Sequence, residues 1–240
     1  MIFVKKKILI AAAAVLVAAA GVFGFFVVSD MIQENRLEAE INEINDMVNA
    51  ESIDIDAVYE RLDTTVTSGD YAVVEAAVKS YLRDSFDNSI RIAEILNDER
   101  ITGILTAENY EADGKAFEQT KKYITETRAE LETLKANYSA FFTEEKAMSY
   151  IEDKGLDSYY TDLYKDRYIG DLEAAGSDKT VENSIDEIIN TLDISEDVIN
   201  YLAENQSSWR LNGGSIVFNS EEQSAEYDRL IARLSGGAAA

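Results

Sequence analysis

Residues 71–96 read YAVVEAAVKSYLRDSFDNSIRIAEIL, and apolar side chains recur in this stretch at every third or fourth position. Such spacing places them on one face of an α-helix, where they can pack against a core. The residues on this face are Val74, Val78, Tyr81, Leu82, Phe86, Ile90, Ala93 and Leu96. The stretch therefore predicts a long helix with one buried side.

Helical spacing also marks the segments on either side of this stretch. Residues 30–66 follow it with an interruption at Glu51, and residues 108–142 follow it for the longest distance, with Gly114 as a weak point. Because the chain contains no Pro, long helices can continue without a break. Shorter helices are predicted over residues 156–174, 181–192 and 196–204, the last two divided by Asp193-Ile194-Ser195.

The pattern changes near the C-terminus. Residues 208–218 read SWRLNGGSIVF, in which two short β-prone runs flank Asn212-Gly213-Gly214. An Asn-Gly turn between such runs predicts a β-hairpin. The following Ser220-Glu221-Glu222-Gln223 has the form of a capping box and predicts a last helix that continues to Leu234.

Local signals also predict where several helices begin and end. The side chains of Ser52 or Asp54 and of Thr143 can accept hydrogen bonds at helix N-termini, and Gly155 can end a helix. Short connections between long amphipathic helices favour antiparallel neighbours. The predicted fold class is all-α, with an N-terminal transmembrane helix followed by an antiparallel helical bundle and a small β-hairpin near the C-terminus.

The membrane prediction rests on Ile8–Val28, which reads ILIAAAAVLVAAAGVFGFFVV and has no polar side chain in 21 residues. As a helix it would be about 31 Å long, close to the thickness of a hydrocarbon core of about 30 Å. Lys5–Lys7 precede it, whereas Asp30 and Glu34 follow it. The positive-inside rule then places the N-terminus in the cytoplasm and the C-terminal domain on the extracytoplasmic side of the cell membrane.

An alternative is a cleaved signal peptide that ends after Ala20, within Ala18-Ala19-Ala20. The apolar run continues past this site to Val28, which favours an uncleaved signal anchor. The expected domains are a cytoplasmic tail, the transmembrane anchor, an extracytoplasmic helical bundle, the hairpin with its terminal helix packed on the bundle, and a flexible tail. Their respective ranges are 1–7, 8–28, 29–205, 206–234 and 235–240.

The composition excludes several classes of function. The 240 residues carry a net charge of −24, and residues 31–240 carry −26 because Lys5–Lys7 and Asp30 precede them. So acidic a surface repels phosphate backbones, and we expect no nucleic-acid partner. The chain has no Cys and no His, which removes thiol nucleophiles, imidazole bases and the commonest transition-metal ligands. We therefore expect no enzyme activity, no cofactor and no metal.

Four aromatic residues are candidates for a ligand or partner surface. Tyr160, Tyr164 and Tyr168 follow each other at intervals of four and would share one face of a helix, and Trp209 is the only Trp. Aromatic faces of this kind can stack against a sugar or a peptide. The simpler interpretation is packing, with the tyrosines half buried and Trp209 closing one end of the bundle against residues 216–218 of the hairpin.

Carboxylate pairs supply a weaker, enzymatic hypothesis. Glu182 with Asp186, or Asp153 with Asp157, could act as acid and base in the manner of glycosidases. With 46 acidic residues in the chain, pairs at such spacings also arise by chance. A carboxylate-based glycan hydrolase therefore ranks behind the non-enzymatic hypotheses.

The layout of a basic tail, one spanning helix and an extracytoplasmic helical bundle resembles the sensor half of bacterial chemoreceptors and sensor kinases. The resemblance is one of layout, because the sequence shows neither a second apolar run of spanning length nor a cytoplasmic output domain. The leading expectation is a single-pass envelope protein whose acidic domain binds a partner protein or cell-wall component, or self-assembles as a homo-oligomer. The lipid bilayer is then a partner through residues 8–28. The alternative is an accessory ligand-binding sensor coupled to a separate membrane protein.

Overall fold

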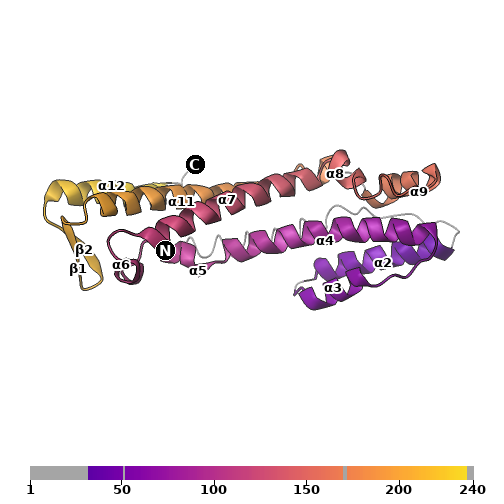
Figure 1. Cartoon of the computed structure of the whole chain (residues 1–240), viewed down its shortest axis with the longest axis horizontal. Coiled ribbons are helices and arrows are strands. Elements are labelled where there is room, and N and C mark those ends of the chain that lie inside the picture. The colour runs from indigo at the N-terminus through magenta and orange to yellow at the C-terminus, as the bar shows by residue number, and fades with distance from the viewer. Residues whose placement is uncertain (1–31, 51, 170–171, 237–240) are drawn as a thin grey trace. The chain divides into compact units, whose positions relative to one another are not determined.

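A computed structural model of the chain describes residues 32–50, 52–169 and 172–236 (Figure 1). This part is mostly helical and contains one two-stranded antiparallel hairpin near the C-terminus, which confirms the helical class and the hairpin. The predicted tail 1–7 and membrane span 8–28 lie outside the described residues. Among the helices that are described, none combines the length and the apolar character needed to cross a bilayer.

The described chain forms two compact units, each made of segments that are distant in sequence. We call residues 95–133 with 183–236 unit 1, and residues 32–94 with 134–182 unit 2. Helices α4 (Asp70–Leu96), α7 (Glu118–Phe141) and α11 (Thr180–Glu204) contribute residues to both units. The sequence-based boundary at residue 205 stays a prediction, and the two units divide the chain at other points.

Unit 2 is built around the first part of α4. Apolar residues of α2 and α3, among them Leu37, Ile41 and Val58, pack with Val74 and Tyr81 of α4 in one core. The remaining short helices of the unit add side chains to this core. The helices of unit 2 other than α4, α7 and α11 are α2 (Ile32–Val48), α3 (Ile55–Asp63), α8 (Glu144–Met148), α9 (Ser158–Leu163), the π-helix η1 (Tyr164–Ile169) and α10 (Leu172–Ala175).

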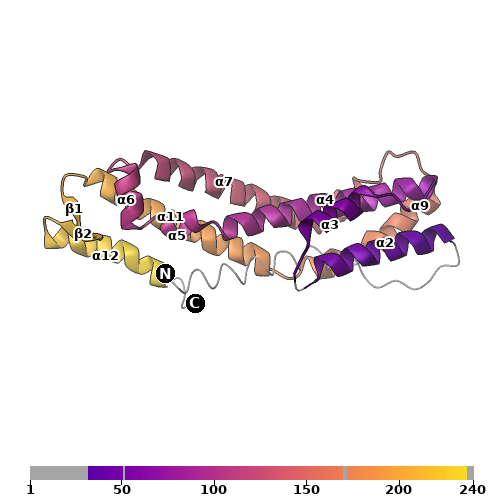
Figure 2. The same ribbon diagram turned by 90° about the horizontal axis from the view of Figure 1, so that it is seen from below.

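Unit 1 contains the hairpin and the last helix. Tyr201 of α11 donates its hydroxyl to the Gln223 carbonyl at 2.9 Å, and Arg233 pairs with Asp197 at 2.6 Å. These contacts hold the last helix, α12, alongside α11, as Figure 2 shows. The elements that belong to unit 1 alone are α5 (Glu99–Gly103), α6 (Ala107–Asp113), β1 (Trp209–Asn212), β2 (Ser215–Phe218) and α12 (Glu221–Gly236).

The hairpin has a defined register, with Trp209 opposite Phe218 and Asn212 opposite Ser215. The two-residue turn is therefore Gly213-Gly214, one position later than the predicted Asn-Gly turn. Both glycines have positive φ, at 59° and 80°, which is the conformation that a type I′ hairpin turn requires.

The predicted helix starts are confirmed. Asp54 accepts a hydrogen bond from the Ala57 amide at 3.1 Å, and Thr143 accepts one from the Lys146 amide at 3.3 Å. The Ser220 hydroxyl accepts the Gln223 amide at 3.3 Å, as a capping box requires.

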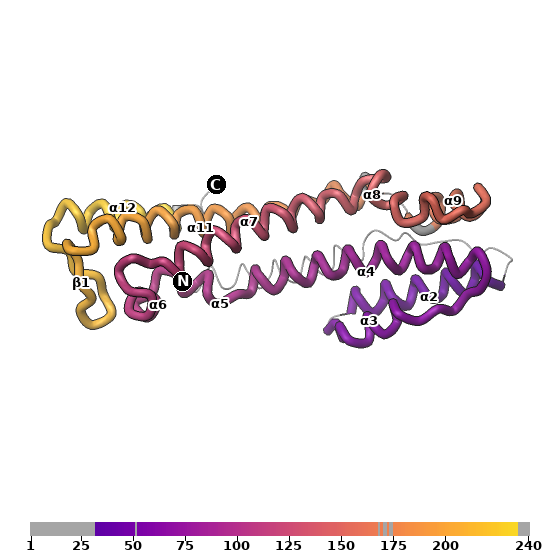
Figure 3. The backbone as a smooth tube through the Cα atoms, viewed as in Figure 1, coloured from indigo at the N-terminus to yellow at the C-terminus, as the bar shows by residue number. Residues whose placement is uncertain are grey.

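The predicted break at Asp193-Ile194-Ser195 is wrong, because α11 runs through it (Figure 3). Ile194 and Ser195 are buried, and Asp193 and Glu196 both pair with Arg128 of α7. Burial and ion pairs thus outweigh the low helix propensity of Asp and Ser. The single α-helix predicted over residues 156–174 is also wrong, because the chain changes there from α9 to a π-helix and then to α10.

The weak point at Gly114 is a complete break between α6 and α7, with φ 71° and ψ −178°. Only glycine adopts this conformation without strain. We predict that Gly114→Ala lowers the free energy of unfolding by about 1–3 kcal/mol. Urea unfolding followed by circular dichroism measures the change.

Gly103 is the matched control, because it lies in α5 without a positive φ. A Cβ added at either glycine would have no atom within 4 Å. Gly103→Ala should leave the stability unchanged or raise it by up to about 1 kcal/mol. Equal losses in both variants would contradict the assigned backbone strain.

Candidate functional site

The predicted tyrosine face is mainly a packing surface. Tyr164 is 1% exposed, and its hydroxyl donates to the Ala147 carbonyl at 2.8 Å. Tyr160 is half buried and meets the ring of Tyr71 edge-on, with 5.1 Å between centroids. The side chain of Tyr168 lies outside what the structure describes. A ligand-binding role for this face stays a prediction, with Tyr160 as its more accessible described member.

Trp209 is also a buried residue of unit 1. Its ring stacks on Phe117 at 6.1 Å between centroids, and its indole N–H donates to the Leu202 carbonyl at 2.8 Å. The Lys115 ammonium lies 4.5 Å from the centre of the ring and donates to the Trp209 carbonyl. The surroundings of Trp209 are therefore those of a packing residue.

The carboxylates proposed as catalytic pairs have structural contacts. Asp157 caps α9 through the Tyr159 amide at 3.1 Å, and Asp153 is exposed. Glu182 is buried and accepts hydrogen bonds from Ser139 at 3.1 Å and Lys179 at 2.9 Å. Within the described residues, no three acidic side chains gather in a way that could hold a metal ion.

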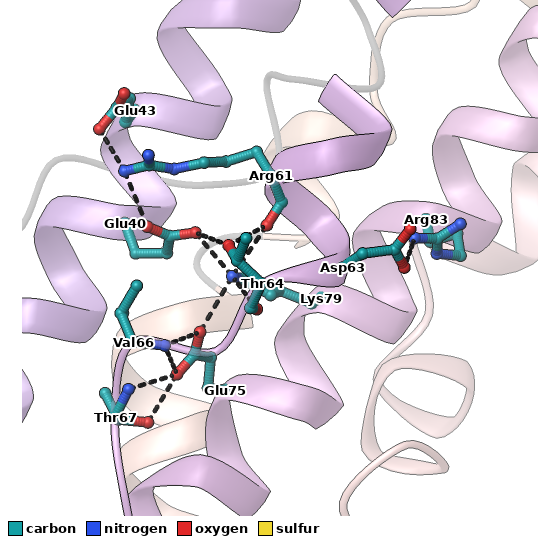
Figure 4. A network of polar contacts seen from close by, with 10 residues as sticks. All are labelled: Glu40, Glu43, Arg61, Asp63, Thr64, Val66, Thr67, Glu75, Lys79 and Arg83. Carbon is teal, nitrogen blue, oxygen red and sulfur yellow. Dashed lines mark hydrogen bonds and ion pairs between the residues drawn. The ribbon is translucent and has the colours of Figure 1, made fainter. Parts of the chain in front are cut away.

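Unit 2 contains a group of charged side chains, most of them buried, that the sequence pattern did not mark as a site. We call Glu40, Arg61, Glu75 and Lys79 the Lys79 cluster (Figure 4). The Lys79 ammonium lies 2.6 Å from Glu40 Oε1 and 2.9 Å from Glu75 Oε1, and its side chain is 5% exposed. It also donates to the backbone carbonyls of Thr64 and Arg61 at 2.8 and 3.1 Å. One cation therefore joins α2, α4 and the end of α3.

Glu75 connects α4 to the segment that precedes it. Its carboxylate accepts the Val66 amide at 3.0 Å, the Thr67 amide at 2.9 Å and the Thr67 hydroxyl at 2.6 Å (Figure 4). Burial by itself would raise the pKa of Glu75, but the hydrogen bonds from Thr67, Lys79 and the two amides outweigh it and lower that pKa. The carboxylate is therefore held in its charged form.

Glu40 completes the cluster from α2. Its second oxygen lies 2.9 Å from the Arg61 guanidinium, which also pairs with the exposed Glu43. In the sequence, Glu40 stands beside the apolar residue Ile41, and Glu75 precedes Lys79 by four positions. A Glu–Lys pair at this spacing is ordinary on helix surfaces. Nothing in that pattern reveals that this pair is buried.

Another buried carboxylate, Glu34, holds the first turn of α2. Glu34 is 2% exposed and accepts hydrogen bonds from the hydroxyls of Tyr71, at 3.1 Å, and Tyr159. The Arg167 guanidinium lies 3.7 Å from its other oxygen. Burial, followed by the hydrogen bonds with Tyr159 and Glu34, raises the pKa of Tyr71, so its hydroxyl stays a donor. We call these four residues the Glu34 cluster.

Unit 2 also has an open groove with a volume of about 480 Å³, formed by α4, the last part of α7 and α8. Its size falls in the range of small-ligand sites, about 300–1,000 Å³. The lining combines apolar side chains, among them Leu134 and Ala140, with polar side chains that carry both signs of charge. The polar lining residues are Asp84, Asp87, Asn88, Arg91, Asn137 and Lys146, and Phe141 adds an aromatic ring.

Comparison with known proteins found no relative of this chain. No protein family, no curated protein and no solved structure matched it.

The Lys79 cluster gives a direct stability prediction. Lys79→Met leaves the carboxylates of Glu40 and Glu75 buried without their shared cation, which should lower the free energy of unfolding by about 3–5 kcal/mol. Urea unfolding at pH 7 measures the loss. Lys165→Met, which removes an exposed partner of Glu144 in the same unit, is the control and should change the stability little. A loss of unfolding free energy no larger than that of the control would show that the ion pairs of the cluster do not stabilise the fold.

The pKa of Glu75 gives a prediction about pH. Its pKa in the folded protein lies below the ordinary value of about 4.3. The stability it contributes is therefore present above that value and is lost as the pH falls through the folded-state pKa. Glu75→Gln should destabilise the protein at pH 7, and the difference from the parent should shrink below about pH 4 as the parent's carboxyl is protonated.

Parallel urea titrations at pH 7, 5, 4 and 3 measure this difference. Glu94→Gln is the control on the same helix, because Glu94 is 58% exposed and pairs only with Arg91 at 2.9 Å among the ion pairs of the described residues. Its small effect should hardly change with pH. A pH-independent loss in Glu75→Gln would contradict the charge-based account.

Proposed function

We propose that the chain is a non-enzymatic, single-pass membrane-anchored envelope protein whose acidic extracytoplasmic helical domain binds a protein or cell-wall partner. The observation that carries the proposal is the apolar run Ile8–Val28, preceded by Lys5–Lys7 and followed by acidic residues. The exported part is then an antiparallel bundle of long helices with the hairpin and α12 packed on it.

The structure of α2 supports this proposal. Three residues separate Val28 from Ile32, so α2 begins within about 14 Å of the end of the predicted span. The Glu34 cluster holds the first turn of α2, and the Lys79 cluster together with Leu37 and Ile41 holds its middle. The helix next to the bilayer is therefore part of the folded core of unit 2.

The structure of α2 also favours a second candidate, an accessory sensor that passes a binding event to a separate membrane protein. A sensor needs a ligand site and a rigid connection to the membrane. The groove between α4, α7 and α8 offers the first, and α2 with its two buried clusters offers the second. Both candidates require the same membrane anchor.

The anchor is tested by topology in bacterial cells. The full chain should stay with the membrane pellet after alkaline carbonate extraction, and protease added to spheroplasts should digest its C-terminal domain. Replacing Lys5, Lys6 and Lys7 by Glu should reduce or invert this orientation, because the positive charges direct it. The control replaces Lys121, Lys122 and Lys154 by Glu, which makes the same charge change far from the anchor in the sequence and should leave the orientation intact.

A mature protein that starts at Gly21 and leaves the membrane in carbonate would contradict the anchor. Partner binding is tested separately, by crosslinking the chain in intact cells and measuring the mass of the adducts. A chain that stays monomeric and uncrosslinked under all conditions would count against a binding role and against self-assembly.

A further inference from the structure

The groove of unit 2 differs in charge from the rest of the acidic chain. Asp84 and Asp87 of α4 line it together with two cations, Arg91 and Lys146. Its formal charges therefore balance, whereas residues 31–240 carry a net charge of −26. A groove that carries charges of both signs is suited to a ligand that carries both signs.

Lys146 is one of the two cations of the groove. Its ammonium lies 5.3 Å from the centre of the Phe141 ring and 4.8 Å from that of Tyr150. Cation–π contacts of this kind hold the side chain in place without neutralising it. Among the residues that the structure describes, Lys146 makes no ion pair with a carboxylate, although acidic residues outnumber basic ones two to one. Its charge is therefore available to a carboxylate of a ligand.

Asp84 and Asp87 supply the negative charges of the groove. Each carboxylate accepts a tyrosine hydroxyl, from Tyr150 at 2.6 Å and from Tyr59 respectively. Burial and the hydrogen bond with Asp87 raise the pKa of Tyr59 to about 12, so this hydroxyl stays protonated and keeps donating. A carboxylate that accepts one such bond still has lone pairs for an ammonium group.

One side chain contacts both Lys146 and Asp84. Tyr150 carries the Lys146 ammonium over its ring and donates its hydroxyl to Asp84, so its ring separates the positive and negative groups. Asn88 and Asn137 line the same groove, and their amides can bind peptide N–H and C=O groups. This arrangement matches a ligand whose charged ends are separated by an amide.

We propose that the groove binds a short peptide with free amino and carboxyl ends, such as a dipeptide. The ligand carboxylate would lie against Lys146, and the ligand ammonium would lie between Asp84 and Asp87. A zwitterion has no net charge, so the strongly acidic surface does not repel it as it repels anions. This inference rests on the ligand site of the sensor candidate and names its ligand, and binding in the groove does not itself depend on the membrane anchor.

The test is isothermal titration calorimetry on the full chain in detergent micelles, with dialanine as the ligand. Two capped forms, N-acetyl-dialanine and dialanine amide, each lack one of the two charges. We expect dialanine to bind at least ten times more tightly than either capped form. Equal binding of all three forms, or no heat from dialanine at ten-millimolar concentration, would overturn the proposal.

Variants of the chain test the two ends separately. Lys146→Gln and Asp84→Asn should each weaken dialanine binding at least tenfold, whereas Lys146→Arg should retain it. The controls are Lys165→Gln and Asp63→Asn, which remove exposed charges of the same unit and should bind as the parent does. Equal weakening in the controls would overturn the assignment to the groove.

Thermal unfolding followed by circular dichroism shows whether each variant is folded. If Lys146→Gln loses stability, Lys146→Arg still tests whether a positive charge at this position is enough for binding. A chito-oligosaccharide serves as a ligand of another class. Binding of this glycan in place of dialanine, unaffected by Lys146→Gln, would also contradict the proposal. Peptide binding by a chain that fails the membrane test would overturn the anchor and leave the groove assignment in place.

Discussion

The structure of unit 2 depends on one buried cation. The Lys79 ammonium lies between the carboxylates of Glu40 and Glu75 and also binds two backbone carbonyls. Removing such charges from water costs several kcal/mol per ion, and only near-complete pairing offsets that cost. The groups that bind Lys79 come from α2, α3, α4 and the connection before α4. All of these contacts can therefore form together only when the elements are packed in this one arrangement. The cluster thus specifies how α2 packs, in addition to the apolar contacts that hold it.

This constraint has a functional consequence for α2. An anchor helix followed by a loose linker would leave the domain free to move relative to the bilayer. Here the Glu34 and Lys79 clusters hold α2 at its first turn and at its middle, so the chain enters the core within a few residues of the predicted span. In our proposal, the anchor and unit 2 are mechanically continuous. Both candidate functions, the anchored binding protein and the sensor, would use that continuity.

Much of the local structure could be predicted from sequence, whereas the buried polar groups could not. Periodicity located α4 and α7, and the turn and capping signals located the hairpin and the starts of α3, α8 and α12. The false break at residues 193–195 came from propensity alone, which cannot include the burial of Ile194 or the pairing of Asp193 with Arg128. Glu34, Glu40 and Lys79 look like solvated surface charges in an acidic chain. Only the packing of distant segments shows that they are buried, and the same holds for the residues that the groove brings together.

The central claim is that α2 belongs to the same cooperative structure as the part of α4 in unit 2. Native-state hydrogen exchange of the full chain measures this directly, because amides that open only when the unit unfolds share one free energy of opening. The account predicts that the amides of residues 37–48 exchange with the same protection as those of residues 74–86. Exchange of residues 37–48 many times faster than that of α4 would show that α2 opens independently and would contradict the claim.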